Sequence, residues 1–219
     1  MIRRFAALGD IHAEDEHLAA ALGHIRTLEH DAILAVGDIV DGRGDVDACV
    51  RLLRAHRVIA VRGNHDRWIL GDQLRTLSHA HHRNDLDDET VAWLGALPPT
   101  WTGESVAGTL LLCHGVGDDD MIRLRPDDDI ATLAENEPLS RVRASGVQVM
   151  VCGHTHRPMV RTIFGLLVVN AGTLHHADNP SFVHVDLEAH TAQTFTIDGS
   201  RVIAAETLRF QPDDVWGAF

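Results

Sequence analysis

The sequence predicts an α/β fold in a single domain spanning residues 1–219, and three features of the chain lead to this prediction. In the first half, short apolar runs alternate with stretches whose apolar residues have helical spacing, an order typical of a largely parallel sheet. After Gly153 the chain becomes rich in strand-like runs separated by turn residues. No repeat, linker or low-complexity tract divides the chain, and 219 residues suffice for one domain with a substantial core.

The first half contains three predicted strands and four predicted helices. The strands are expected at Arg3–Leu8, Ala32–Val36 and Val58–Val61. The helices are expected at His17–Leu28, Val46–Leu53, Trp68–Leu77 and Thr90–Leu97. Asp45 precedes the second of these helices as a candidate N-cap, and Pro98 marks the end of the last one. These elements form the strand–helix units of the α/β prediction.

The second half is predicted to end in a β meander. Two apolar runs, Thr109–Cys113 and Val147–Cys152, have strand length, and a helix is expected near Pro138–Ala144 between them. The acidic runs Asp118–Asp120 and Asp127–Asp129 are interpreted as solvated loops. The meander strands are expected at Met159–Ile163, Leu166–Val169, Phe182–Asp186 and Ala192–Ile197.

The composition excludes several classes of function. A net charge of −13 disfavours binding to long nucleic acid or to an anionic membrane surface. No run approaches the ~20 apolar residues of a membrane span, and the run Phe5–Leu8 is shorter than the ~7–15 apolar residues of a secretion signal. Three cysteines without CxxC spacing predict neither a disulfide framework nor a thiolate zinc site. We therefore expect a cytoplasmic protein without membrane partners, in which the 16 histidines call for another explanation, metal binding first.

Five apolar runs share one arrangement: each ends beside a glycine and at least one potential metal ligand. The ligand-type residues that follow these runs are Asp10 and His12, then Asp38 and Asp41, then Asn64 and His65, then His114, and finally His154 and His156. In open α/β sheets, ligands bind outside the carboxyl ends of the strands. The pattern therefore predicts that carboxylates, imidazoles and one amide oxygen gather at one rim.

This donor set suits transition metals. Mixed oxygen and nitrogen donors fit Mn, Fe, Zn, Ni or Co better than Ca or Mg. One ion takes about four ligands, so the seven residues Asp10, His12, Asp38, Asn64, His114, His154 and His156 are too many for one ion. They suit two ions that share a bridging ligand. Paired ions ~3.5–4 Å apart generate a bridging hydroxide and hold both oxygens of an in-line phosphoryl displacement.

The five motifs, in this order, resemble the calcineurin-like metallophosphoesterase superfamily, and they extend from residue 10 to residue 156. The matching motifs are Asp10-x-His12, Gly37-Asp38-x-x-Asp41, Gly63-Asn64-His65-Asp66, His114 and Gly153-His154-x-His156. The resemblance implies a two-sheet β-sandwich flanked by helices. It also assigns roles. Asp10, His12 and His156 would hold the first ion, Asn64, His114 and His154 the second, and Asp38 would bridge them. His65 would face the substrate, and Asp41 would orient the side chain of His65.

The implied activity is hydrolysis of small phosphate diesters or monoesters by a dinuclear centre, with Mn as the expected metal and Fe, Zn, Ni or Co as alternatives. Protein phosphatases and diadenosine-polyphosphate hydrolases of the superfamily carry Arg directly after the residue matching Asp41. Here Gly42 follows and Arg43 comes one position later, which disfavours assignment as a protein phosphatase. Small prokaryotic phosphodiesterases often carry Cys in place of His65, and a histidine there permits poorer leaving groups.

Two alternatives remain within the superfamily. One is a protein or nucleotide phosphatase. The other is an inactive interaction module, as in a retromer subunit that has this fold, although such proteins tend to have lost ligands and none is missing here. Neither the physiological substrate nor the oligomeric state follows from the sequence.

Several other residues have two interpretations. Arg62 and Arg157 could contact an anionic oxygen or lie in solvent, and Arg62 is the predicted substrate-binding residue. Asp66 is expected to cap the following helix rather than to act behind the metal ligands. Cys113 and Cys152 are expected to be buried apolar residues. Five histidines are expected in solvated loops, with contact to substrate or a further metal as the alternative. They are His79, His81, His82, His175 and His176.

Overall fold

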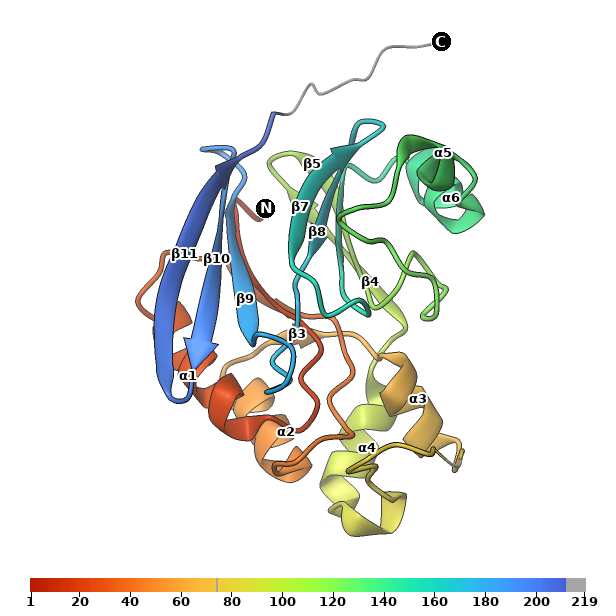
Figure 1. Cartoon of the computed structure of the whole chain (residues 1–219), viewed down its shortest axis with the longest axis vertical. Coiled ribbons are helices and arrows are strands. Elements are labelled where there is room, and N and C mark those ends of the chain that lie inside the picture. The colour runs from red at the N-terminus through yellow and green to blue at the C-terminus, as the bar shows by residue number, and fades with distance from the viewer. Residues whose placement is uncertain (74, 212–219) are drawn as a thin grey trace.

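The structure of the chain, a computed structural model, describes residues 1–73 and 75–211 (Figure 1). It contains two mixed β-sheets with helices on their outer sides. The predicted fold class, an α/β two-sheet sandwich flanked by helices, is confirmed. Across the described residues, 1–73 and 75–211, the helices all fall short of the length and apolar character that a bilayer crossing requires.

The first sheet has the strand order β11-β10-β9-β1-β2-β3. Its three parallel strands are β1 (Arg4–Leu8), β2 (Ala32–Ala35) and β3 (Ile59–Ala60). Its antiparallel strands are β9 (Ser181–Asp186), β10 (Thr191–Asp198) and β11 (Arg201–Arg209). The meander predicted after Gly153 is therefore confirmed for β9 and β10, and together with β11 they extend this sheet beyond β1.

The second sheet has the order β4-β5-β6-β8-β7. Its parallel strands are β5 (Gly108–Cys113), β6 (Val149–Cys152) and β8 (Leu166–Asn170). Its antiparallel edges are β4 (Thr100–Ser105) and β7 (Met159–Ile163). The prediction of one meander after Gly153 was wrong for β7 and β8, because they belong to this sheet. The chain then crosses to the first sheet through residues 171–180.

Side-chain alternation along the strands places apolar residues on both faces of the sheets. In β1, Phe5 and Ala7 face the second sheet, and Ala6 and Leu8 face the helices on the outer side. The core between the sheets joins Phe5 and Leu34 to Leu110, Val151 and other strand residues. On the outer side of the first sheet, apolar residues of α1 (Asp15–Ile25), α2 (Val46–Ala55) and α4 (Asp88–Ala96) complete a second core. The two sheets are thus held face to face with their strand ends side by side.

The helix predicted at Trp68–Leu77 is displaced. The structure has α3 at Asn64–Leu70, with Gly71 at its C-cap. The helix begins directly after Gly63, so Asn64 and His65 lie in its first turn. The apolar pattern starts only at Trp68, because the first turn faces the predicted site and is polar. The described part of residues 71–77 is not helical.

Other helices agree with the sequence patterns or were not predicted. Asp45 caps α2, since its side chain accepts a hydrogen bond from the amide of Ala48. The helix predicted near Pro138–Ala144 is α6 (Glu137–Ala144). A short helix, α5 (Ile130–Ala134), was missed because the acidic run before it suggested a loop, whereas Asp129 is its N-cap. Strands β4 and β11 were also not predicted.

Candidate metal centre

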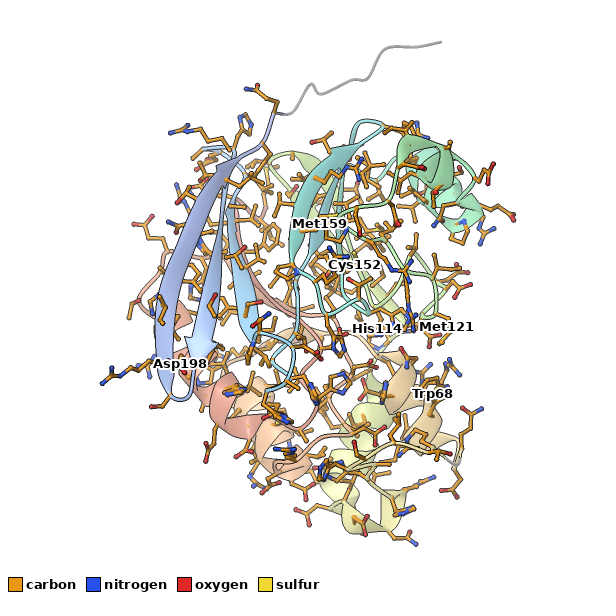
Figure 2. All side chains as sticks on the ribbon, viewed as in Figure 1. Trp68, His114, Met121, Cys152, Met159 and Asp198 are labelled. Atoms are coloured by element: carbon orange, nitrogen blue, oxygen red, sulfur yellow. The ribbon has the colours of Figure 1, made fainter. Side chains whose placement is uncertain are left out.

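The predicted ligands lie at neighbouring strand ends of the two sheets. Asp10 and His12 follow β1, Asp38 follows β2, and Asn64 follows β3. From the second sheet, His114 follows β5, and His154 and His156 follow β6. Figure 2 places His114 between the second sheet and α3. The structure therefore brings all seven residues together, and five of them are buried: Asp10, His12, Asp38, Asn64 and His114.

The backbone at these residues is in a conformation that side chains rarely adopt. Four of the candidate ligands have positive φ angles: His12 at 49°, Asp38 at 47°, His154 at 66° and His156 at 59°. Asp41 is in the same region at 66°. Non-glycine residues in this region cost energy and concentrate at functional sites. The strand-end turns are thus shaped to direct side chains inward.

Two glycines allow the strand-end turns to approach the carboxylates closely. A Cβ atom on Gly63 would lie 2.1 Å from Oδ1 of Asp38, and one on Gly153 would lie 2.4 Å from Oδ1 of Asp10. Real Cβ atoms do not occupy such positions, so any side chain would displace the carboxylate. The glycines of the sequence motifs are therefore required by contacts within the site.

Asp10, His12 and His156 form the first cluster of potential ligands. Nδ1 of His12 donates to the carbonyl of Asp41 at 2.9 Å, and Nδ1 of His156 donates to Asp178 at 2.8 Å. In the neutral rings each Nε2 is then left with a lone pair, and these two Nε2 atoms lie 3.0 Å apart.

A carboxylate oxygen completes the first cluster. Oδ2 of Asp10 is buried, has no hydrogen-bond partner among the described residues, and lies 3.1 Å from Nε2 of His156. Electron-pair donors that converge in this way fit a cation between them.

The second cluster contains Asn64, His114 and His154. Nδ1 of His114 donates to the carbonyl of Val36 at 2.9 Å, which directs Nε2 toward the other donors. Nε2 lies 2.9 Å from Oδ1 of Asn64, 3.2 Å from Nδ1 of His154 and 3.3 Å from Oδ2 of Asp38. Burial lowers the pKa of His114, but Asp38 and Asp10 outweigh burial and raise that pKa to about 10. The potential at this position therefore strongly favours positive charge.

Asp38 lies between the two clusters. Its carboxylate lies close to His114 and His154 on one side and to His12 and His65 on the other. Burial raises the pKa of Asp38, but the neighbouring histidines, His114 first, hold it below its usual range, so the carboxyl group is ionised. Asp38 is the residue placed to contact both clusters.

His65 and Asp41 form a hydrogen-bonded pair beside the clusters. Nδ1 of His65 donates to Oδ2 of Asp41 at 2.8 Å, which leaves Nε2 3.9 Å from Oδ2 of Asp38. Burial lowers the pKa of His65, but Asp41 and Asp38 raise it above its usual value. The pair has the arrangement of a proton donor oriented by a carboxylate.

Asp66 caps the start of α3, as predicted, but it does so from the third helical position, and Gly63 is the N-cap residue. The helix begins at Asn64, so Asp66 lies within its first turn, fully buried. Its carboxylate accepts hydrogen bonds from the amides of Gly63 at 3.0 Å, Ile39 at 2.8 Å and Val40 at 3.2 Å. Asp66 therefore ties the turn after β2, which carries Asp38, to the start of α3.

Three residues near the site were not predicted or were assigned differently. Asp178 accepts from both His156 and His175, and Arg75 donates to Asp41. His79 and His82 are exposed as predicted, but His81 is half-buried and its amide donates to Asp41 at 2.9 Å. No sequence motif marks these residues, because the path of the loops that carry them decides their contacts.

The remaining predictions concern residues outside the two clusters. Cys113 and Cys152 are buried thiols, as predicted. The acidic runs were predicted as solvated loops, yet two of their residues form ion pairs. Arg67 donates two hydrogen bonds to the carboxylate of Asp120, and Arg157 donates one to Asp127 at 2.7 Å. His176 forms a hydrogen bond with Glu14. Together with His175 these two residues form a further group of potential metal ligands.

A cleft of 500 Å³ opens onto the clusters. Its lining combines site residues (Asp38, Asn64, His65, His154, Thr155, His156 and Asp178) with the side chains of Trp68, Leu77, Met121, Arg123 and Arg125. Trp68 and Met121 lie on the same side of the molecule as His114 (Figure 2). Arg62 lines a separate cavity of 340 Å³ that shares His114, so its predicted contact with substrate stays a prediction.

The chain is similar to known proteins over most of its length. The family described as "Calcineurin-like phosphoesterase superfamily domain" matches residues 4–190. An uncharacterised protein of Methanocaldococcus jannaschii is 23% identical over 189 residues, which cover 81% of this chain and 72% of that protein.

Two solved structures share the fold. A metallophosphoesterase from Sphaerobacter thermophilus has a TM-score of 0.67 and 21% identity, covering 91% of this chain and 89% of that chain. A hypothetical protein from Pyrococcus horikoshii has a TM-score of 0.73 and 18% identity, covering 90% of this chain and 88% of that chain.

Proposed function

The chain belongs to the calcineurin-like phosphoesterase superfamily, and from this premise we propose that it hydrolyses small phosphate esters with two divalent metal ions bridged by Asp38. Phosphoesterases of this superfamily use divalent metals, and the histidine and carboxylate clusters of this chain supply suitable ligands. In this proposal Asp10, His12 and His156 hold one ion, and Asn64, His114 and His154 hold the other.

One observation carries the proposal. The Nε2 atoms of His12 and His156 lie 3.0 Å apart while both Nδ1 atoms are committed as donors, and the buried Oδ2 of Asp10 next to them has no partner among the described residues. A folded protein does not place three such acceptors together without a cation or protons to separate them.

When bound, two divalent ions supply Lewis acidity to the phosphoryl oxygens and acidify a water molecule for in-line attack. The residues of the chain have other tasks. Asp178 and the carbonyl groups of Asp41 and Val36 orient the ligand imidazoles. His65, held by Asp41, donates a proton to the departing oxygen through Nε2. A cleft of 500 Å³ suits an ester of small size, diester or monoester.

The experiment combines metal analysis with an activity assay. Protein purified without chelator should contain close to two transition-metal ions per chain, and with added Mn it should hydrolyse bis-p-nitrophenyl phosphate or p-nitrophenyl phosphate. Asp38→Asn should lose metal and activity together. His65→Ala should retain metal. Its turnover should fall ~10²–10⁴-fold for an ester of a simple alcohol, the usual contribution of a general acid, and by less for the p-nitrophenyl esters.

Asp127→Asn is the matched control, because Asp127 is an exposed aspartate whose partner Arg157 lies at the surface. This variant should resemble the wild type in both measurements. A chain that neither retains metal nor hydrolyses either ester would refute the proposed function and favour an interaction module on the same fold.

A further inference from the structure

Arg75 lies behind the His65–Asp41 pair. Its side chain is 7% exposed, and its guanidinium donates two hydrogen bonds to the carboxylate of Asp41. Nε donates to Oδ2 at 2.8 Å, and Nη2 donates to Oδ1 at 3.1 Å. Such a planar two-bond contact fixes the orientation of a carboxylate as well as its position.

The segment that carries Arg75 fixes the guanidinium in turn. Nη1 donates to the carbonyl of Gln73 at 2.9 Å, and Nη2 also donates to the carbonyl of His81. The amide of His81 donates to Oδ1 of Asp41 at 2.9 Å. Each oxygen of Asp41 therefore has two donors: His65 and Arg75 on Oδ2, and Arg75 and His81 on Oδ1.

We propose that Arg75 is a positioning residue for phosphoester hydrolysis, acting through Asp41 to hold His65. The carboxylate of an aspartate rotates readily about its last bond. The guanidinium prevents that rotation, so Oδ2 stays in line with Nδ1 of His65 and Nε2 of His65 stays directed at the cleft. This inference rests on the proposed function, in which His65 gives a proton to the leaving oxygen.

The role predicts a dependence on the leaving group. An ester of an acidic phenol expels its leaving group without help, whereas an ester of a simple alcohol needs the proton from His65. In the Mn-loaded full chain, Arg75→Met should lower kcat for a methyl or ethyl ester about 10–100-fold, the usual effect of removing a residue that orients a functional histidine. For the 2,4-dinitrophenyl ester, kcat should change less than about threefold by the same reasoning.

Three further variants separate positioning from structural support. Arg75→Lys keeps the positive charge but loses the planar guanidinium that makes two hydrogen bonds to the carboxylate. Its kcat for the alkyl ester should therefore fall between those of the wild type and Arg75→Met. In a His65→Ala background, Arg75→Met should cause no further loss, because the residue that it positions is absent. Arg83→Met is the control, since Arg83 is exposed on the same segment and should leave both substrates unaffected.

The outcomes are distinct. Equal losses for both esters, or a full additional loss in the His65→Ala background, would overturn the positioning role. If His65→Ala itself has no effect on the alkyl ester, the proposed role of His65 fails instead. If Arg75→Met does not fold, as judged by circular dichroism, the comparison of the two esters with Arg75→Lys decides the question.

A separate observation concerns the leaving-group side of the cleft. Trp68 follows His65 by one helical turn, and their ring centroids are 4.9 Å apart. Trp68 and Leu77 line both the 500 Å³ cleft at the clusters and an adjoining cavity of 530 Å³, whose other lining residues are Gln73, Arg75 and Thr76. Leu77 is 45% exposed although it is apolar. An apolar surface thus begins beside His65 and leads away from the clusters.

We infer that Trp68 and Leu77 form a subsite for a planar, apolar leaving group such as an aryl alcohol. The oxygen that receives a proton from His65 lies next to Nε2, so the group attached to that oxygen lies against the neighbouring Trp68 ring. Stacking on an aromatic ring favours planar groups over aliphatic groups of the same size. This inference also rests on the proposed function, yet it concerns substrate choice and not the proton.

The test uses two phosphate diesters whose leaving alcohols are equally acidic, one aryl and one fluoroalkyl. Trp68→Leu should lower kcat/KM about 3–10-fold for the aryl ester and less than twofold for the alkyl ester. Trp68→Phe should recover most of the loss. Trp93→Leu on α4 serves as the control for a tryptophan outside the cleft. Equal losses for both esters in Trp68→Leu would overturn the subsite, and absence of any hydrolysis by the wild type would refute the proposed function itself.

Discussion

Asp38 shows how one residue can carry several parts of a site. It has a left-handed backbone, its carboxylate lies beside His114 at 3.3 Å, and its Oδ1 accepts the amide of His65 at 2.8 Å. The same side chain therefore connects both clusters and the start of α3. The family resemblance implies that Asp38 bridges two ions, and the structure places Asp38 between the two clusters.

At the residue scale the sequence predicts which side chains come together at the site better than it predicts the residues that support them. All seven candidate ligands follow glycine-marked strand ends, and the structure brings them together. Arg75, His81 and Asp178 lie on loops without such marks, so their contacts with Asp41 and His156 follow only from the path of the chain. Their roles, like those of the ligands, are open to the tests above.

A residue far from the site supports a prediction about acid stability. Asp31 accepts hydrogen bonds from the amides of Arg3 and Arg4 and from the side chain of Arg3, which lower its pKa from 3.8. A carboxyl with a lowered folded pKa stabilises the fold above its unfolded pKa, and this stabilisation is lost as the pH falls through the folded value.

Asp31→Asn should therefore lower the free energy of unfolding by about 1 kcal/mol at neutral pH, the net value of a partly exposed charge-assisted contact. The difference from wild type should shrink as the pH falls below about 4. Urea titrations of both proteins at three pH values test this. A difference that stays constant, or grows, toward acid would contradict the role of the charge.

At the scale of elements, α3 shows why the site distorts local sequence signals. Its apolar pattern starts at Trp68, but the helix starts at Asn64 because Gly63 and Asp66 hold its first turn against the loop after β2. The sequence therefore predicts the existence of the helix but not its limits. Strand β4 was missed because most of its residues, Thr100–Ser105, are polar or glycine.

Two glycine substitutions should have opposite effects. In Gly63→Ala the new Cβ would lie 2.1 Å from Oδ1 of Asp38 and 2.4 Å from its amide nitrogen, so metal binding should fall and stability should drop by about 1–3 kcal/mol. In Gly23→Ala, within α1, nothing lies within 4 Å of the new Cβ, and stability should rise by about 0.5–1 kcal/mol.

Thermal unfolding together with metal analysis of both variants checks this pair. Destabilisation by Gly23→Ala would show that α1 is packed differently from the structure. Full metal content in Gly63→Ala would show that Asp38 can move without losing its place in the site.

At the scale of the whole molecule, the candidate ligands join two sheets. Asp10, His12 and Asp38 follow strands of the first sheet, and His114, His154 and His156 follow strands of the second. The sequence predicts that five strand ends share a rim, and the structure shows that this rim is made by two sheets. The order of strands could not be predicted, because strands distant in the sequence, such as β1 and β9, become neighbours. That the 219 residues act as one domain stays a prediction.

Removal of metal should loosen the junction of the sheets. An ion bound only by the native state at 100 times its Kd stabilises that state by about 2.7 kcal/mol. For a chain of this size that corresponds to an increase in Tm of roughly 5–10 °C on adding Mn to chelator-treated protein. Asp38→Asn should lose most of the increase, whereas Asp127→Asn should retain it. Equal increases in both variants would indicate that Mn binds elsewhere.

Anomalous X-ray scattering from crystals of the Mn-loaded protein tests the two-ion site most directly. We predict two peaks about 3.5–4 Å apart. One peak should lie among Asp10, His12 and His156, the other among Asn64, His114 and His154, with Asp38 in contact with both. A single peak, or peaks that do not contact Asp38, would contradict this prediction.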